Sequence, residues 1–156
     1  MPVDFGREQK EFTEKVIQVN RVSKKTKGGN RIGFSVLMVV GDRRGRVGVG
    51  LGKAPDVSSA IRKGLKRAQK ELFRVSLRGD TIPHLVLMKW GAAEVLIKPA
   101  PPGTGLITGG AIRAVAEAVG IKDMVSKILG TKNKASNVYA TIEAFRKLKP
   151  VEHSKS

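Results

Sequence analysis

Segment 41–55 combines positive charge with bare backbone, a pairing suited to binding phosphate groups. Three glycines alternate with three branched apolar residues, so a strand here would bury one face and leave backbone open on the other. The basic side chains at both ends can neutralise phosphates. The glycine face has two possible uses, which are close approach of a polyanion or packing of a helix from the same chain. The basic residues are Arg43, Arg44, Arg46 and Lys53, and the glycines are Gly48, Gly50 and Gly52.

A second basic segment, residues 24–31, has the composition of a hairpin tip. Its two glycines let the loop enter a narrow space beside a polyanion while the neighbouring lysines neutralise phosphates. We expect such a partner to order this loop, because a basic loop flanked by glycine buries little surface alone. With a basic helix face and one further loop, the remaining candidate residues for binding a nucleic acid are Arg21, Lys24, Lys25, Lys27, Gly28, Gly29, Arg31, Arg62, Lys63, Lys132 and Asn133.

The composition supports a polyanionic partner. The chain has 30 Lys and Arg against 13 Asp and Glu, a formal net charge of +17, and a field of this sign favours nucleic acid or an anionic membrane. Between Arg21 and Lys70 there are 14 basic and two acidic residues. No segment approaches the roughly 20 apolar residues of a spanning helix, and residues 1–15 lack the apolar core of a secretion signal. We therefore expect a soluble protein that is not exported.

The sequence offers little to catalysis or to metal binding. It has no cysteine, and two histidines are too few for a histidine-based metal cluster. Segment 105–111 lacks the Lys and Ser or Thr of a phosphate-binding loop. Segment 48–52 has no third glycine at the spacing that a dinucleotide site needs, and its flanks do not form the strand-to-helix turn of such a site. We predict no enzymatic activity, no catalytic residue, no metal and no cofactor.

The first half of the chain predicts three strands followed by a helix. Apolar residues favour strands over residues 14–25 and 32–40, and the glycine-alternating segment predicts the third. A helix begins after Pro55, with Asp56 or Ser58 as the capping residue. Its core-facing stripe is predicted to comprise Ile61, Leu65, Ala68 and Leu72.

The second half predicts a different arrangement, and the chain favours two small cores over one. Residues 82–90 and 93–99 read as a hairpin, residues 111–119 as a helix ended by Gly120, and residues 123–129 as a short helix. A last helix, capped near Ser136, turns Val138, Ile142, Phe145 and Leu148 inward and stops at Pro150. The predicted organisation is a flexible segment 1–13, domains 14–74 and 75–150, and a tail 151–156.

A stiff loop between residues 99 and 110 is a candidate protein interface. Prolines restrict its backbone, while glycines leave a contact surface with almost no side chains. A bulky charge there would disturb a protein contact rather than a reaction. The candidate interface residues are Gly103, Thr104, Gly105, Gly109 and Gly110.

Several blocks in register give the chain a resemblance to the small-subunit ribosomal protein S-five family, over nearly its whole length. The most specific blocks are 41–54 and 99–115. The others are Arg21-Val22-Ser23-Lys24, Lys27-Gly28-Gly29 and Ala140-Thr141-Ile142. The resemblance implies an α+β fold, with a double-stranded-RNA-binding-like domain (three-stranded antiparallel sheet plus helix) and a C-terminal α/β sandwich domain.

The resemblance also implies a function. Members of this family are structural constituents of the bacterial small subunit that bind its 16S rRNA near the neck and the path by which mRNA enters. They lie beside proteins S-four and S-eight and contribute to assembly and decoding accuracy. Their response to spectinomycin involves the hairpin that corresponds here to residues 21–31. The resemblance thus implies a cytoplasmic, ribosome-bound protein.

The chain departs from the family pattern at two places. The family usually has aromatic residues at the positions of Val49 and Leu51, and an Asn-Pro pair at Asn133-Lys134. We therefore expect recognition by phosphate charge and RNA shape rather than by base stacking. Two alternatives stay open at this point, a free-standing double-stranded-RNA-binding module and an RNA-modifying or nucleotide-dependent enzyme.

Overall fold

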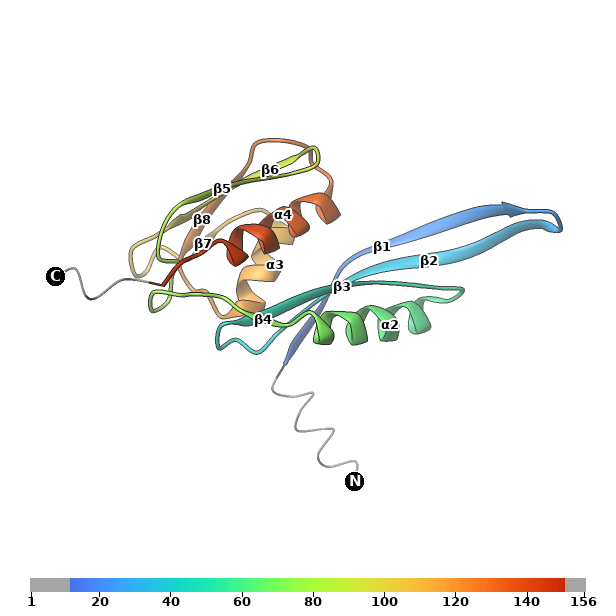
Figure 1. The fold of residues 1–156 in the computed structure, drawn as a ribbon, viewed down its shortest axis with the longest axis horizontal. Helices are drawn as coiled ribbons and strands as arrows, with labels where there is room; N and C mark the ends of the chain where they lie inside the picture. The colour runs from blue at the N-terminus through green and yellow to red at the C-terminus, as the bar shows by residue number, and fades with distance from the viewer. Residues whose placement is uncertain (1–11, 151–156) are drawn as a thin grey trace, which may run out of the picture.

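A computed structural model describes residues 12–150, apart from the side chains of residues 24–26 and 30. The predicted flexible segment 1–13, except for its last two residues, and the tail 151–156 lie outside this range. The N-terminal half forms an antiparallel sheet in the order β1-β2-β3-β4, with one helix, α2, on one face (Figure 1). Its elements are β1 (Thr13–Thr26), β2 (Gly29–Gly41), β3 (Arg46–Ala54), α2 (Val57–Lys70) and the two-residue strand β4 (Phe73–Arg74).

Helix α2 covers the glycine face of β3, which decides between the two uses left open above. A Cβ added at Gly48, Gly50 or Gly52 would lie well under 3.0 Å from backbone atoms of α2. The face is therefore filled by the chain's own helix, and a polyanion cannot approach it. On the other face of β3, Val47 and Val49 are buried in the core and Leu51 is partly buried against it.

The predicted stripe of α2 is confirmed only at Ala68. Ala60 and Gly64 are the other buried positions of the helix, whereas Ile61 and Leu65 are only partly buried beside them, and Leu72 lies beyond the end of the helix. Close approach to the glycines of β3 requires small residues along the line of contact, so the larger side chains flank it. Asp56 is the N-cap, since its carboxylate accepts a hydrogen bond from the backbone N–H of Ser59 at 3.0 Å.

The C-terminal half forms a mixed sheet in the order β5-β6-β8-β7. Helices α3 and α4 lie between this sheet and the N-terminal sheet, so the layers are α2, sheet, helix pair and sheet (Figure 1). Gly120, at φ +100°, ends α3 as predicted. The elements are β5 (Val86–Trp90), β6 (Ala93–Pro99), β7 (Leu106–Ile107), α3 (Gly110–Val119), β8 (Met124–Ile128) and α4 (Lys134–Arg146).

Three predictions for this half were wrong in detail. Segment 123–129 is the strand β8 rather than a short helix, because β6 and β7 pair with it on both sides. The cap of α4 is Asn133, whose side-chain oxygen accepts from the N–H of Ser136 at 3.1 Å, and the helix ends at Arg146 rather than at Pro150. The first strand of the hairpin begins at Val86 rather than at residue 82.

One large core joins the two halves, in place of the two separate cores that were expected. Val39 and Val47 of the N-terminal sheet are fully buried in the same cluster as Val115 of α3, Phe145 of α4 and Val95 of β6. A smaller cluster lies under α2. The helix pair buries apolar residues against both sheets, so separating the halves would expose this core. The boundary near residues 74–75 stays a prediction.

Candidate nucleic-acid interface

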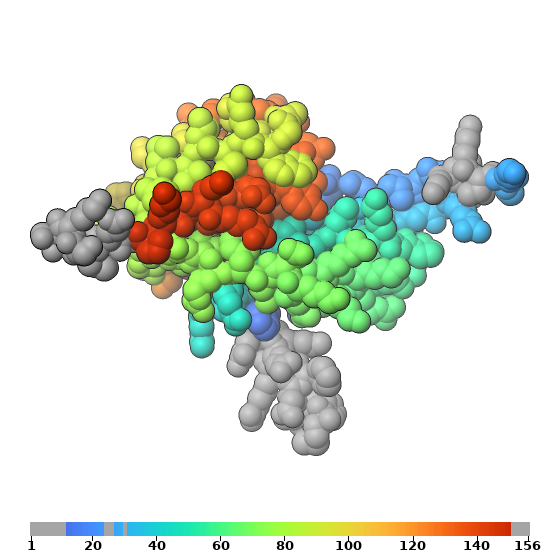
Figure 2. Space-filling model, in the orientation of Figure 1, coloured from blue at the N-terminus to red at the C-terminus, as the bar shows by residue number. Residues whose placement is uncertain are grey.

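The β1–β2 hairpin extends as an arm beyond the body of the molecule. We define the arm as residues 21–34, where pairing runs from Arg21 with Phe34 to Thr26 with Gly29. Its base packs beside α2 through Phe34, and its outer part extends past α2 and the C-terminal half (Figures 1 and 2). A Cβ at Gly28 would meet no atom within 4 Å, so the backbone is open at this position of the tip.

Basic side chains of the arm face solvent. Arg21, Lys27 and Arg31 are exposed, and none of the ion pairs among the described residues includes them. The side chains of Lys24 and Lys25 lie outside the described part of the structure, although their backbone continues β1 to the tip. A projecting basic hairpin can thus offer several charges to one polyanion.

The β2–β3 turn, residues 42–45, is held in place by the C-terminal end of α3. The backbone N–H groups of Arg43 and Gly45 donate to the carbonyls of Ala118 and Val119, both at 2.9 Å. These carbonyls belong to the last turn of the helix, where they have no partner within it. Arg43 has a φ of +59°, so this backbone conformation depends on the contact with α3.

The side chain of Asp42 organises the same turn. Its carboxylate accepts from the N–H groups of Arg44 and Arg46 at 2.8 and 2.9 Å, and from Nε of Arg46 at 2.8 Å. Partial burial by itself would raise the pKa of Asp42, but the hydrogen bonds from Arg46 and Arg44 lower it below its usual value. Arg46 is thus already ion-paired, whereas Arg43 and Arg44 are exposed and unpaired among the described residues.

The outer face of α2 carries a third group of basic residues. Arg62 donates to the hydroxyl of Ser59 at 3.2 Å, and Lys63 lies 3.4 Å from the carbonyl of Lys53. These partners are neutral, so the positive charges remain available to an anion. The exposed basic residues of this face are Arg62, Lys63, Lys66, Arg67 and Lys70, with Lys53 at the end of β3.

Two predicted RNA-binding residues lie apart from the others. Lys132 and Asn133 belong to the loop before α4, on the side of the N-terminal sheet opposite α2 (Figure 1). Lys132 is exposed and borders a cavity of about 300 Å³. The Asn133 oxygen is occupied by the cap of α4, so a structural role accounts for this residue.

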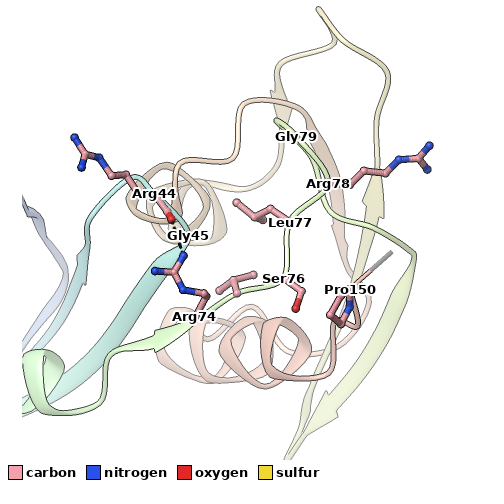
Figure 3. Close-up of a pocket in the computed structure, with 9 residues that line it drawn as sticks. Arg44, Gly45, Arg74, Ser76, Leu77, Arg78, Gly79 and Pro150 are labelled. Atoms are coloured by element: carbon pink, nitrogen blue, oxygen red, sulfur yellow. Dashed lines mark hydrogen bonds between the residues drawn. The ribbon is translucent and has the colours of Figure 1, made fainter. Parts of the chain in front are cut away.

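The structure reveals two arginines that the sequence analysis missed. Arg74 and Arg78 line a hollow of about 790 Å³ together with Arg44, Leu77 and Pro150 (Figure 3). These residues come from three separate segments of the chain. Alternation along residues 74–78 could not have found this pair, because residues 75–77 belong to no strand and the side chains of Arg74 and Arg78 point to opposite sides (Figure 3).

Hydrogen bonds hold the loop that carries the candidate interface residues in place. The N–H of Gly105 donates to the carboxylate of buried Asp123 at 2.9 Å, and the hydroxyl of Thr104 donates to the carbonyl of Pro101 at 2.7 Å. A Cβ at Gly103 or Gly110 would meet nothing within 4 Å. This side-chain-free surface is therefore open, and Asp123 is a supporting residue that sequence analysis did not single out.

We next consider metal binding, a role for histidine and membrane spanning in residues 12–150. No cluster of three or more His, Cys, Asp or Glu side chains there could hold a metal ion. His84 accepts a hydrogen bond from the N–H of Lys149 at 3.0 Å, which gives this histidine a structural role. Within the same range, no helix has the length and apolar character needed to cross a membrane.

Comparisons with known proteins agree with this arrangement. Residues 12–76 match the family described as ribosomal protein S5, N-terminal domain, and residues 88–155 match its C-terminal domain. Among similar proteins is the small ribosomal subunit protein uS5 of Syntrophobacter fumaroxidans, 49% identical over 144 residues that cover 92% of this chain and 87% of that protein. The protein of the same name from Dehalococcoides mccartyi is 51% identical over 132 residues, 85% of this chain and 77% of that one. A chain that matches both domains in order, at about half identity, belongs to the ribosomal protein S5 family of non-enzymatic structural proteins.

Proposed function

We propose that this chain binds small-subunit (16S) rRNA through the arm, the β2–β3 turn and the outer face of α2. As a member of the S5 family it is a structural constituent of the small ribosomal subunit, and its place of action is the cytoplasmic ribosome. The observation that carries the proposal is the arm, where Arg21, Lys27 and Arg31 are exposed without an acidic partner among the described residues. Each can neutralise one phosphate.

The recognition mode is charge and shape. Val49 and Leu51, which replace the aromatics usual in the family, point into the core and cannot stack on bases. Trp90 and Tyr139 stack on each other with 4.9 Å between ring centroids, so each ring already has a stacking partner within the protein. Contacts to phosphates and sugars dominate in this mode, so the protein positions RNA helices more than it reads their sequence.

A salt titration with matched variants tests the arm. In the full chain, Arg21, Lys27 and Arg31 are replaced together by Gln, and rRNA affinity is measured at several salt concentrations. The slope of log K against log salt should become flatter by roughly 2, at about 0.7 to 0.9 for each phosphate contact. The control replaces Lys98, Lys122 and Lys127, three exposed residues of the C-terminal half, and removes the same charge. An arm variant no different from this control would exclude the arm.

We further propose that the protein binds near the neck of the subunit and the path by which mRNA enters, beside proteins S-four and S-eight. The open surface of Gly103, Gly105 and Gly110 is the candidate contact with S-four, through which the protein influences decoding accuracy. Sedimentation with small subunits tests the ribosomal assignment itself. Absence from purified subunits would instead favour a free-standing double-stranded-RNA-binding module.

A further inference from the structure

The hollow beside the β2–β3 turn is lined by residues from three segments of the chain. The turn contributes Arg44 and Gly45, the connection after α2 contributes residues 74–79, and the end of the described chain contributes Pro150. Figure 3 shows Arg44 and Arg78 on opposite sides of the hollow, with Leu77 between them and with the guanidinium groups of both arginines pointing outward. At about 790 Å³, it has room for more than one polar group of a ligand.

The hollow is strongly positive. Among the described residues its lining includes three arginines and no acidic residue, and none of the three belongs to an ion pair within that part of the chain. Arg74 donates from Nη1 to the carbonyl of Arg44 at 3.3 Å, which leaves its charge uncompensated. Guanidinium groups bind phosphate oxygens in pairs, through two parallel N–H donors.

The walls of the hollow are already in place without a ligand. The N–H of Val75 donates to the carbonyl of Gly45 at 2.6 Å, and the N–H of Gly45 donates to Val119 at 2.9 Å. Val75 itself is 3% exposed and belongs to the main core. Binding therefore requires the side chains of Arg44 and Arg78 to turn toward the ligand (Figure 3) but no ordering of the backbone, which lowers the entropic cost.

The apolar part of the lining narrows the choice of ligand. Leu77 and Pro150 lie between the arginines (Figure 3), so charged and apolar contacts alternate across the hollow. An RNA backbone has this alternation, with phosphates separated by ribose rings. The hollow is also continuous with Arg44 of the turn proposed above to bind rRNA.

We infer that this hollow binds a segment of RNA backbone, with phosphates on Arg44, Arg74 and Arg78 and a ribose against Leu77. The inference rests on the proposed rRNA binding and adds a site to it, at the far end of the N-terminal sheet from the arm. Because the hollow borders both halves, RNA bound there would bridge the β2–β3 turn and the connection to the C-terminal half.

Two triple variants of the full chain test the site. Replacing Arg44, Arg74 and Arg78 by Gln should flatten the salt dependence of rRNA binding by roughly 2 in slope. Replacement by Lys keeps the charge but removes the guanidinium fork, so the slope should stay near that of the wild type while affinity falls at least about threefold. The control is again the Gln replacement of Lys98, Lys122 and Lys127. Equal effects of the Gln triple and this control would overturn the inference, since net charge alone would then explain them.

A position-specific probe provides the second measurement. The chain has no cysteine, so Ser76→Cys in the lining of the hollow can carry a single tethered hydroxyl-radical source. Ala92→Cys, exposed in the β5–β6 hairpin, serves as the matched control. We expect cleavage of one short rRNA segment from position 76, absent from position 92 and lost when the three arginines are replaced by Gln.

The outcomes separate this site from the proposed function. If the wild-type chain does not bind rRNA, the proposed function fails. If it binds through the arm but position 76 gives no cleavage, the hollow alone is excluded. Unchanged rRNA affinity of the Gln triple, with weakened binding to other small-subunit proteins, would assign the hollow to an acidic protein partner and overturn the inference.

Discussion

Two glycine-rich regions of the molecule look alike in sequence and differ in what surrounds them. In β3, a Cβ at Gly48, Gly50 or Gly52 would overlap the backbone of α2. By contrast, a Cβ would meet no atom within 4 Å at Gly103, in the loop after β6, or at Gly110, the first residue of α3. Glycine in the strand is needed so that two backbones can approach, whereas glycine in the loop leaves a surface open to another molecule.

The difference extends to how each region is held. Strand β3 has β2 on one side, the two-residue strand β4 on the other and α2 against its glycine face. The loop is held by single tertiary hydrogen bonds, from the N–H of Gly105 to Asp123, from the N–H of Met124 to the carbonyl of Gly105, and from the N–H of Ala100 to the hydroxyl of Thr81. A glycine substitution should therefore affect folding in β3 and partner binding in the loop, and four substitutions test this contrast.

Gly50→Val should have the largest effect. The new side chain would overlap backbone atoms of Gly64 and Ala68, and α2 cannot move without uncovering its small core. We expect a loss of at least about 3 kcal/mol in the free energy of unfolding, measured by urea denaturation. Gly110→Val, the same change at an open site, is the control. A stable Gly50→Val protein would show that α2 does not need the bare strand.

Asp123→Ala should release the loop. It leaves the partly buried N–H of Gly105 without its carboxylate acceptor, and a hydrogen bond of this kind contributes about 1.5 to 3 kcal/mol. Hydrogen exchange at Gly105 should accelerate together with the loss of stability. Asp80→Ala, a change at an exposed carboxylate, should leave this exchange unaltered. Protection of Gly105 that survives in Asp123→Ala would mean that the prolines alone hold the loop.

Gly103→Arg tests the effect of backbone strain at a site where an added Cβ would overlap no other atom. The site is open, but its φ of +89° is a conformation that side-chain-bearing residues seldom adopt. We expect a cost of about 1 to 2 kcal/mol, seen as a lower urea midpoint. Gly110→Arg adds the same charge at a position without a positive φ, so the difference between the two variants isolates the backbone term.

Gly110→Arg should have the smallest effect on stability, within about 0.5 kcal/mol of the wild type, and a functional effect in the ribosome. If the open loop contacts protein S-four, the added charge should weaken that contact and raise misreading in a readthrough reporter. Incorporation into small subunits at the wild-type level is the necessary control. Normal misreading under that condition would remove the loop from the account of decoding accuracy.

Much of the fold could be predicted from local sequence patterns. The strand β3, the N-cap of α2 at Asp56 and the end of α3 at Gly120 each depend on residues within a few positions of one another. Segment 123–129 misled for the same reason. Seven residues are too few to separate a helical from a strand period, and its strand conformation comes from pairing with β6 and β7.

The basic segments of the interface could also be predicted, since net charge and loop composition are properties of the chain itself. Whether their side chains are free to bind a partner could not be predicted. Arg46 is ion-paired to Asp42, Asn133 caps α4, and the glycine face of β3 is covered by α2. Each of these outcomes depends on which groups lie within hydrogen-bond or van der Waals distance after folding.

The hollow lined by Arg44, Arg74 and Arg78 could not be predicted from the sequence. Its lining combines residues 44–45, 74–79 and 150, which no periodicity links. They meet because β4 pairs with β3, the N–H of Val75 bonds to Gly45, and the turn attaches to the end of α3. Charge and local conformation depend on neighbouring residues, so the sequence by itself determines them. The grouping of distant side chains depends on how sheets and helices pack to bury one shared core, so only the tertiary structure determines it.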